Sequence, residues 1–232
     1  MPVKRSRAKA APGAEAGELR ERIVAASIEL IEAEGLARLS MREVARRAGV
    51  THQAPYHHFA DREAILGEIA ARGFRLLMAE IERVAAAIPI GGGAEREIDR
   101  LMAIGTAYVD FACTYPAHFR IMFRPELVDL ENCPGARAEG DNAFSAFRRI
   151  VHAAVDAGIP AQPSEEALVA CLWSIVHGLS CLLLDGPLAM KMPETAREVQ
   201  IEAVMGATRS LLTAALRAKP SGARKVTRTR VG

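Results

Sequence analysis

Apolar side chains recur at helical spacing along most of the chain. Between residues 18 and 34, Leu19, Ile23, Ala26 and Leu30 share one face, and Gly35 follows as a residue type that ends helices. No stretch shows the strict alternation that is typical of a half-buried strand. The pattern therefore predicts an all-α protein of about nine helices. Further helices are expected at residues 61–85, 95–115, 117–123, 140–157, 164–185 and 194–217.

Two short helical segments follow the first helix, at residues 40–48 and 51–58. Ser40 and Thr51 belong to the residue types that cap helix N-termini, and Gly49 permits a sharp turn between the segments. Apolar residues in the first segment can pack on the first helix, which leaves the second segment free to present its side chains. This spacing predicts a helix-turn-helix arrangement.

The pattern divides the chain into four parts. Residues 1–17 are rich in Ala, Gly, Pro, Lys and Arg and are expected to be a disordered basic arm. Residues 18–62 are predicted to form a three-helix helix-turn-helix domain, and residues 63–217 a larger helical domain. Residues 218–232 are expected to be a basic disordered tail.

Composition narrows the class of protein. Half of the residues are apolar and a quarter are charged, as in an ordinary soluble globular protein. The four cysteines lie far apart without a C-x-x-C pair, so we expect a reducing cytoplasm rather than a disulfide framework or a zinc ribbon. The basic N-terminus lacks the apolar segment of a secretory signal. The chain offers no motif for a cofactor.

Three histidines are concentrated in the stretch GVTHQAPYHHFADRE, residues 49–63. Two metal ligands on one helix need a spacing of three or four residues, which His52, His57 and His58 do not have. We therefore expect no metal site. A catalytic histidine needs a nucleophile or a carboxylate partner, and the segment offers no such context. We therefore expect no catalytic residues and no enzyme.

Contact with nucleic acid is the remaining hypothesis for this stretch. Its side chains are hydrogen-bonding and apolar groups that suit base edges and phosphates. Residues 38–62 also carry five arginines against two acids. An ordinary corner of two helices with a polar outer face is the alternative. The combination of turn, polar helix and local positive charge favours DNA binding.

Residues 167–184 contain no formally charged side chain and reach the length at which a membrane span is considered. His177 interrupts this stretch, acids lie on both sides of it, and no Lys/Arg flank suggests an orientation. A helix that is apolar on all sides is also typical of the buried core of a helix bundle. We therefore favour a buried helix and expect no membrane partner.

Residues 20–70 resemble a known family. The stretch RERIVAASIELIEAEGLARLSMREVARRAGVTHQAPYHHFADREAILGEIA is similar to the N-terminal domain of the tetracycline-repressor (TetR) family of bacterial transcription regulators. The resemblance implies a homodimer that binds a palindromic double-stranded operator and a divergent C-terminal domain that dimerises and binds a small effector. Pro55 departs from the aliphatic residue that is commoner in the family. The residues expected to face DNA are Ser40, Met41, Arg42, His52, Gln53, Ala54, Tyr56, His57, His58 and Arg62.

The C-terminal half carries a second, shorter resemblance. Trp173, His177 and Gly178 in WSIVHGL are similar to a TetR subgroup whose C-terminal domain carries a W-x-x-x-H-G signature. Large residues on the inward stripes of the predicted helices are candidate linings of an apolar cavity, although plain core packing explains each of them equally well. We expect a hydrophobic or weakly polar effector. The candidates are Tyr108, Phe111, His118, Phe119, Met122, Phe147, Trp173 and His177.

The sequence supports a ligand-responsive regulator, most simply a repressor. A DNA-binding dimer without an effector and a helical enzyme or membrane-associated protein are the alternatives. The two C-terminal helices are expected to form much of the dimer interface, because they offer more apolar surface than one small body can hide. The residues expected there are Leu168, Leu172, Ile175, Leu179, Leu182, Leu183, Ile201, Val204, Met205, Leu211 and Leu212.

Overall fold

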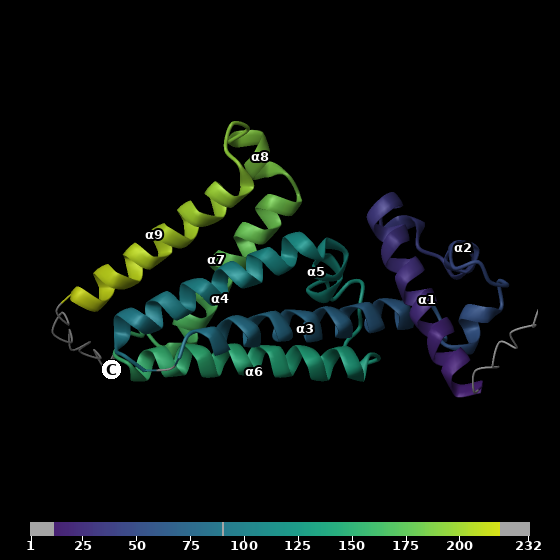
Figure 1. Cartoon of the computed structure of the whole chain (residues 1–232), viewed down its shortest axis with the longest axis horizontal. Coiled ribbons are helices and arrows are strands. Elements are labelled where there is room, and N and C mark those ends of the chain that lie inside the picture. The colour runs from purple at the N-terminus through teal and green to yellow at the C-terminus, as the bar shows by residue number, and fades with distance from the viewer. Residues whose placement is uncertain (1–11, 90, 219–232) are drawn as a thin grey trace, which may run out of the picture. The chain divides into compact units, whose positions relative to one another are not determined.

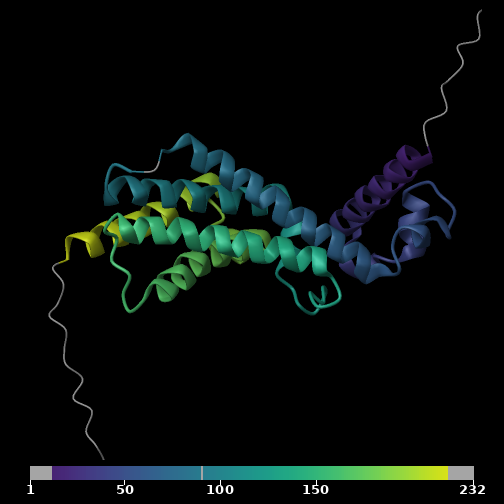
Figure 2. The same ribbon diagram turned by 90° about the horizontal axis from the view of Figure 1, so that it is seen from below.

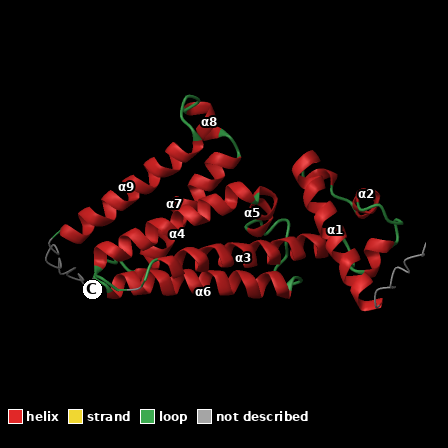
Figure 3. Ribbon diagram, viewed as in Figure 1, coloured by secondary structure: helices red, strands yellow, loops and turns green. Residues whose placement is uncertain are grey.

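The computed structural model describes residues 12–89 and 91–218. Within these ranges all regular structure is helical, as the sequence predicts (Figure 1; Figure 3). Nine α-helices and two 3-10 helices are present in the described part of the chain. Their bounds are α1 Pro12–Glu34, η1 Leu36–Arg38, α2 Met41–Arg47, η2 Ala54–His57, α3 Arg62–Ala87, α4 Ala94–Thr114, α5 Pro116–Met122, α6 Pro134–Asp156, α7 Glu165–Leu184, α8 Pro187–Lys191 and α9 Arg197–Arg217.

The chain forms two compact units. The first unit comprises residues 1–79 and 111–144, and the second unit comprises residues 80–110 and 145–232. The long helices α3, α4 and α6 each contribute to both units. The first unit therefore adds most of α3, the end of α4, α5 and the start of α6 to the predicted helix-turn-helix region. The predicted functional boundary at residue 62 stays a prediction.

Local capping fixes several helix ends where the sequence predicts them. The side chain of Ser40 accepts a hydrogen bond from the backbone amide of Glu43, which caps α2. Asp61 accepts one from the amide of Ala64 at 2.8 Å, which caps α3. Gly49 has a φ of 68°, a left-handed conformation that favours glycine, and it turns the chain after α2.

Two helices begin earlier than the sequence predicts and a third is not predicted at all, and each of the three begins at a proline. α1 begins at Pro12, so the expected disorder of residues 12–17 is wrong; residues 1–11 lie outside the described part of the chain. α6 begins at Pro134 rather than at residue 140, and the unpredicted α8 begins at Pro187. Proline breaks a helix interior but suits the first turn, where its missing N–H costs nothing.

The last helix begins later than predicted. α9 begins at Arg197 rather than at residue 194 and ends at Arg217. The side-chain amide of Gln200 donates to the carbonyls of Met192 and Thr195, which holds the preceding segment as a turn. The predicted basic tail begins at residue 218, which follows α9 as its C-cap, and residues 219–232 lie outside the described part of the chain.

The predicted third helix is the main correction to the fold. In place of an α-helix over residues 51–58, the structure has a turn followed by the short 3-10 helix η2. The predicted cap at Thr51 is absent, because the residue before η2 is Gln53, whose side chain makes no capping hydrogen bond. Pro55 has no amide hydrogen, so an α-helical bond to Thr51 is impossible. The neighbouring amides of Ala54 and Tyr56 instead bond three residues back.

Each unit has its own apolar core. In the first unit, α1, α2 and α3 bury side chains against one another, among them Ile23, Leu30, Val44 and Ile65 at 0% exposure. Figure 2 shows the purple α1 beside α2 and the start of α3. In the second unit, α4, α6, α7 and α9 share a core that includes Ile98, Val151, Leu172 and Leu212. The core of the first unit supports the surface that η2 presents, which is described next.

Candidate nucleic-acid interface

The segment of residues 51–58, here called the recognition segment, presents a polar surface. His52, Gln53, Tyr56 and His57 are exposed, with Tyr56 at 52%. Ala54 and His58 are half-buried. Pro55 is buried, and the carbonyl of Pro55 accepts hydrogen bonds from the amides of His58 and Phe59. The buried proline thus anchors a short turn whose other side chains face outward.

The start of α2 contributes two of its three predicted residues. Ser40 and Arg42 are exposed, whereas Met41 is only 7% exposed. Met41 occupies the inward face of α2 together with Val44 and Ala45. The prediction that Met41 contacts DNA is therefore wrong, because its side chain belongs to the core of the first unit.

Most arginines of this region are engaged within the protein. Arg46 binds Glu43, Arg38 binds Glu34 at 3.4 Å, and Arg47 lies 3.3 Å from Glu34. Among the described residues, Arg42 has neither an ion pair nor a side-chain hydrogen bond. It is exposed, and is the arginine of α2 best placed for a phosphate.

The local positive charge is consequently smaller than the sequence window suggests. Glu34, and also Glu29 at 3.7 Å from Arg47, lie on α1, outside the window of residues 38–62. Sequence reasoning missed the contacts of Arg47 with these two acids because the packing of α1 on α2 is tertiary, whereas the Glu34–Arg38 pair has a four-residue spacing that crosses the edge of the window. No spacing signal within the window would have found them.

Arg62 turns partly inward. One guanidinium nitrogen donates to the carbonyl of Leu36 at 3.3 Å, another lies 3.8 Å from Glu63, and Nε is buried without a partner among the described residues. Arg62 thus connects η1 to the start of α3. A phosphate contact from Arg62 stays a prediction.

The candidate effector residues of the second unit include a hydrogen-bonded trio. The Tyr108 hydroxyl lies 2.9 Å from Nδ1 of His177, and the indole N–H of Trp173 donates to the Tyr108 oxygen at 3.3 Å. Burial raises the pKa of Tyr108 and lowers the pKa of His177, so both are neutral near pH 7. Phe147, in the same unit, packs against the core cluster.

The other four candidates belong to the first unit. Phe111, Phe119 and Met122 are 5% exposed or less, and the Phe111 ring lies 5.5 Å from Tyr115. Such burial fits both core packing and a cavity lining. The structure therefore gathers the eight candidates into two groups, one in each unit, rather than giving all of them direct contacts with one another.

His118 is the polar member of the first group. It is 6% exposed, and its Nδ1 is buried without a hydrogen-bond partner among the described residues. Burial, followed by the positive charge of Arg72, lowers the pKa of His118. A buried neutral imidazole with an unused nitrogen suits the predicted role of orienting a weakly polar molecule.

Two other features bear on the alternatives. Among the described residues, no group of three or more His, Cys, Asp or Glu could hold a metal ion. In the same ranges, α7 is the one helix long and apolar enough to cross a membrane, with 28% of its apolar window buried. One such helix is weak evidence for a membrane span, since core helices of soluble proteins pass the same test of length and composition. The expectation of a buried helix is met only in part, because most of this window is not buried within the described chain.

The fold and the exposed recognition segment define a helix-turn-helix protein. Residues 23–69 match the family described as bacterial regulatory proteins, tetR family, and residues 101–207 match the tetracyclin repressor-like C-terminal domain. The two matches together cover most of the chain. The chain belongs to the TetR family, and this places it among transcriptional regulators rather than enzymes.

Individual relatives agree with this assignment. The chain is 40% identical over 58 residues to the HTH-type transcriptional regulator SrpR of Pseudomonas putida, which is 25% of this chain and 27% of SrpR. The match thus spans about a quarter of that relative. A protein of unknown function from Rhodococcus sp. RHA1 is 27% identical, with a TM-score of 0.65 over 84% of this chain and 93% of its own. A tetR-family regulatory protein from Rhodococcus RHA1, 22% identical, has a TM-score of 0.66 over 84% of this chain and 97% of its own, and supports the fold alone.

Proposed function

We propose that the chain is a cytoplasmic, ligand-responsive repressor that binds a palindromic operator as a homodimer and is released by a small hydrophobic effector. The observation that carries the proposal is the exposed row of His52, Gln53, Tyr56 and His57 on a segment anchored by buried Pro55, within the residues that match the tetR-family model. These side chains offer donors and acceptors of the kind that read base edges and meet phosphates.

Operator binding is tested by selection from a randomised DNA library. The selected duplex is expected to be a palindrome whose half-sites lie about one helical turn, or a small multiple of it, apart. Tyr56→Ala is expected to weaken binding to every duplex if its hydroxyl meets phosphate. Gln53→Ala and His57→Ala are expected to change the preferred sequence instead. Equal affinity of wild type and Tyr56→Ala across a salt series would refute this assignment.

The dimer is supported by apolar and small side chains that α7 and α9 leave exposed. Leu182 is 45% exposed, Val199 53% and Leu211 70%, and small residues lie between the latter two along α9. Two copies of this surface, related by a two-fold axis, can bury it in a four-helix arrangement. Light scattering is expected to give twice the mass of the 25.0 kDa chain at micromolar concentration. A stable monomer would contradict the proposal.

Part of the predicted interface needs correction. Six of the residues assigned to it are buried within the protein's own second unit and offer little surface to a partner. The accessible members of the predicted set are Ile175, Leu182, Leu183, Val204 and Leu211. The buried residues are Leu168, Leu172, Leu179, Ile201, Met205 and Leu212.

The effector is proposed to be apolar with one or two polar groups. His118 and the trio of Tyr108, Trp173 and His177 are the polar groups among otherwise apolar candidates. A compound releases DNA only if it binds the non-DNA arrangement more tightly, and a hundredfold preference corresponds to about 2.7 kcal/mol. The test is a thermal-shift screen of apolar compounds followed by operator affinity with each binder. If no binder changes the operator affinity, the proposed ligand response is wrong, whereas the proposed binding to DNA still stands.

A further inference from the structure

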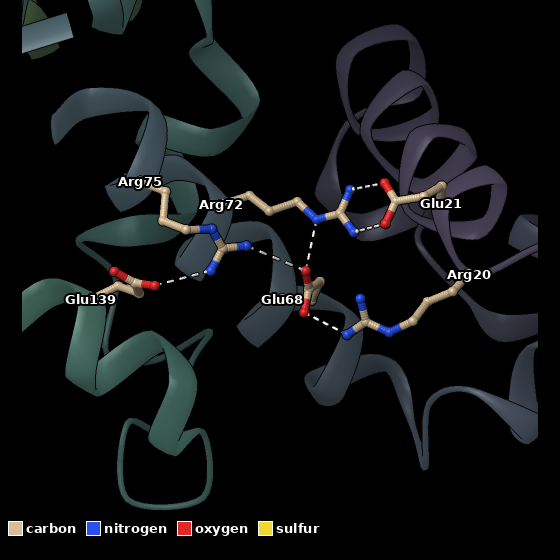
Figure 4. Close-up of polar contacts among 6 residues, drawn as sticks. All are labelled: Arg20, Glu21, Glu68, Arg72, Arg75 and Glu139. Atoms are coloured by element: carbon tan, nitrogen blue, oxygen red, sulfur yellow. Dashed lines mark hydrogen bonds and ion pairs between the residues drawn. The ribbon is translucent and has the colours of Figure 1, made fainter. Parts of the chain in front are cut away.

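Six charged residues of the first unit form one continuous ion network (Figure 4). The guanidinium of Arg72 on α3 donates hydrogen bonds to both carboxylate oxygens of Glu21 on α1, each at 2.6 Å. Its Nε donates to Glu68 at 2.7 Å, one turn earlier on α3. The planar guanidinium matches this geometry, which makes the contact far more specific than that of a single lysine.

Glu68 is the centre of the network. Its second oxygen accepts from Arg20 of α1 at 2.5 Å, and Arg75 of α3 lies 3.6 Å away. Burial by itself raises the pKa of Glu68, but the hydrogen bonds from Arg20 and Arg72 outweigh it, and the pKa is lowered. The Glu68 side chain, 17% exposed, therefore carries its charge in a sheltered position that depends on its arginines.

Arg75 extends the network to α6. Its guanidinium lies 3.2 Å from Glu139 on one side and 3.6 Å from Glu68 on the other. Three arginines and three glutamates then balance one another. Without Glu139, Arg75 would be left with Glu68 alone and would compete with Arg20 and Arg72 for that carboxylate.

The other end of the network reaches the recognition segment. The Arg20 guanidinium lies over the ring of Phe59, 5.0 Å from the ring centre. Phe59 is 4% exposed, and its amide donates to the carbonyl of Pro55 at 2.9 Å. Arg20 is therefore packed against the residue that closes the recognition segment.

We propose that Glu139, on α6, is a positioning residue for DNA recognition, acting through Arg75, Glu68 and Arg20 on Phe59. The proposal rests on the DNA-binding function proposed above. Glu139 itself touches no residue of the recognition segment in the contacts described. Its charge keeps Arg75 shared between Glu139 and Glu68, so that Glu68 keeps Arg20 over Phe59 and the segment stays preorganised.

The sign of the change in operator affinity caused by Glu139→Gln distinguishes this proposal from a general electrostatic effect. Glu139→Gln removes a negative charge, which by itself favours binding to any DNA. The positioning role predicts the opposite for the operator. Asp141→Asn is a matched control, because Asp141 is exposed on the same helix, makes the same charge change, and pairs at 3.9 Å with Arg137 outside the network.

The experiment uses the full chain and two duplexes, one selected by the wild type from a random library and one scrambled. Fluorescence anisotropy at fixed salt is expected to show that Glu139→Gln binds the selected duplex at least about threefold more weakly than wild type. Its affinity for the scrambled duplex should stay equal or rise. Asp141→Asn should bind both duplexes at least as well as wild type.

Arg75→Ala provides the second variant. Because it already cuts the link, adding Glu139→Gln should have no further effect on the selected duplex. The proposal is overturned if Glu139→Gln binds that duplex as well as Asp141→Asn does, or if its effect persists unchanged in the Arg75→Ala background. If the wild type prefers no duplex over the scrambled one, the DNA-binding function itself fails, and the positioning role fails with it.

Discussion

The hydroxyl of Tyr108 lies 2.9 Å from Nδ1 of His177, which joins α4 to α7 inside the second unit. Because the indole N–H of Trp173 can only donate, the Tyr108 oxygen accepts from it, and the hydroxyl proton is left for His177. This arrangement gives the W-x-x-x-H-G stretch a structural role whether or not an effector binds there. It also leads directly to a stability prediction.

Tyr108→Phe should destabilise the protein by about 1–3 kcal/mol, because the variant loses both hydrogen bonds and leaves buried polar atoms behind. Urea unfolding followed by circular dichroism measures the difference. Tyr115→Phe is the control, since Tyr115 is 37% exposed and its hydroxyl bonds to none of the described residues. Equal stability of the two variants would show that the Tyr108 hydrogen bonds contribute nothing.

Gly73→Ala should destabilise the first unit by about 1–3 kcal/mol through overpacking. A Cβ atom there would lie 2.3 Å from Sδ of Met122 and 3.1 Å from Cβ of His118, and the latter cannot rotate away. Gly17→Ala, within α1 and with nothing inside 4 Å of its added atom, should instead be neutral or stabilise by up to about 1 kcal/mol. Thermal unfolding should therefore show a lower midpoint for Gly73→Ala and an unchanged or higher midpoint for Gly17→Ala, and a lower midpoint for both variants would contradict this packing.

His152 should titrate above its ordinary range. A hydrogen bond with Glu165 at 3.0 Å, and then the charge of Asp156, raise the pKa of His152. A raised pKa in the folded state means that this pair stabilises the fold below the unfolded pKa of about 6.5, and that the contribution is lost as pH rises through the folded value. NMR titration should show Glu165→Gln lowering the pKa of His152. An unchanged pKa would mean that the pair does not persist in solution.

Arg42→Ala should reduce the salt dependence of DNA binding by about one counterion equivalent, because Arg42 is exposed and unpaired within the described residues. Arg46→Ala should change that slope less, since Glu43 already neutralises Arg46. The comparison requires affinities at several salt concentrations on one selected duplex. Equal slopes for the two variants would indicate that the pairing of Arg46 dissolves on DNA.

Sequence reasoning succeeds here wherever the signal is local. Apolar spacing locates the helices of both units, and the caps Ser40 and Asp61 fix the starts of α2 and α3 because the bonds span only three residues. Proline has two opposite effects in this chain. It starts α1, α6 and α8, and at Pro55 it replaces an expected α-helix with η2.

The candidate site was predicted less completely because it depends on tertiary contacts. Exposure along the recognition segment follows from its pattern, but the burial of Met41 depends on how α2 packs. The network around Glu68 has one local signal, the Glu68–Arg72 spacing of four residues. Its partners on α1 and α6 lie 48 or more positions away along the chain and share no sequence pattern with it.

The single 3-10 turn at residues 54–57 has a consequence for how such regulators diverge. Side chains three positions apart are eclipsed in a 3-10 helix, so Ala54 and His57 lie on the same side of η2. The turn itself is held by buried Pro55 and Phe59, whereas Gln53, Tyr56 and His57 are exposed. Substitutions at the three exposed positions therefore remove little buried surface, so the outer side chains of this turn can change while the scaffold beneath stays constant.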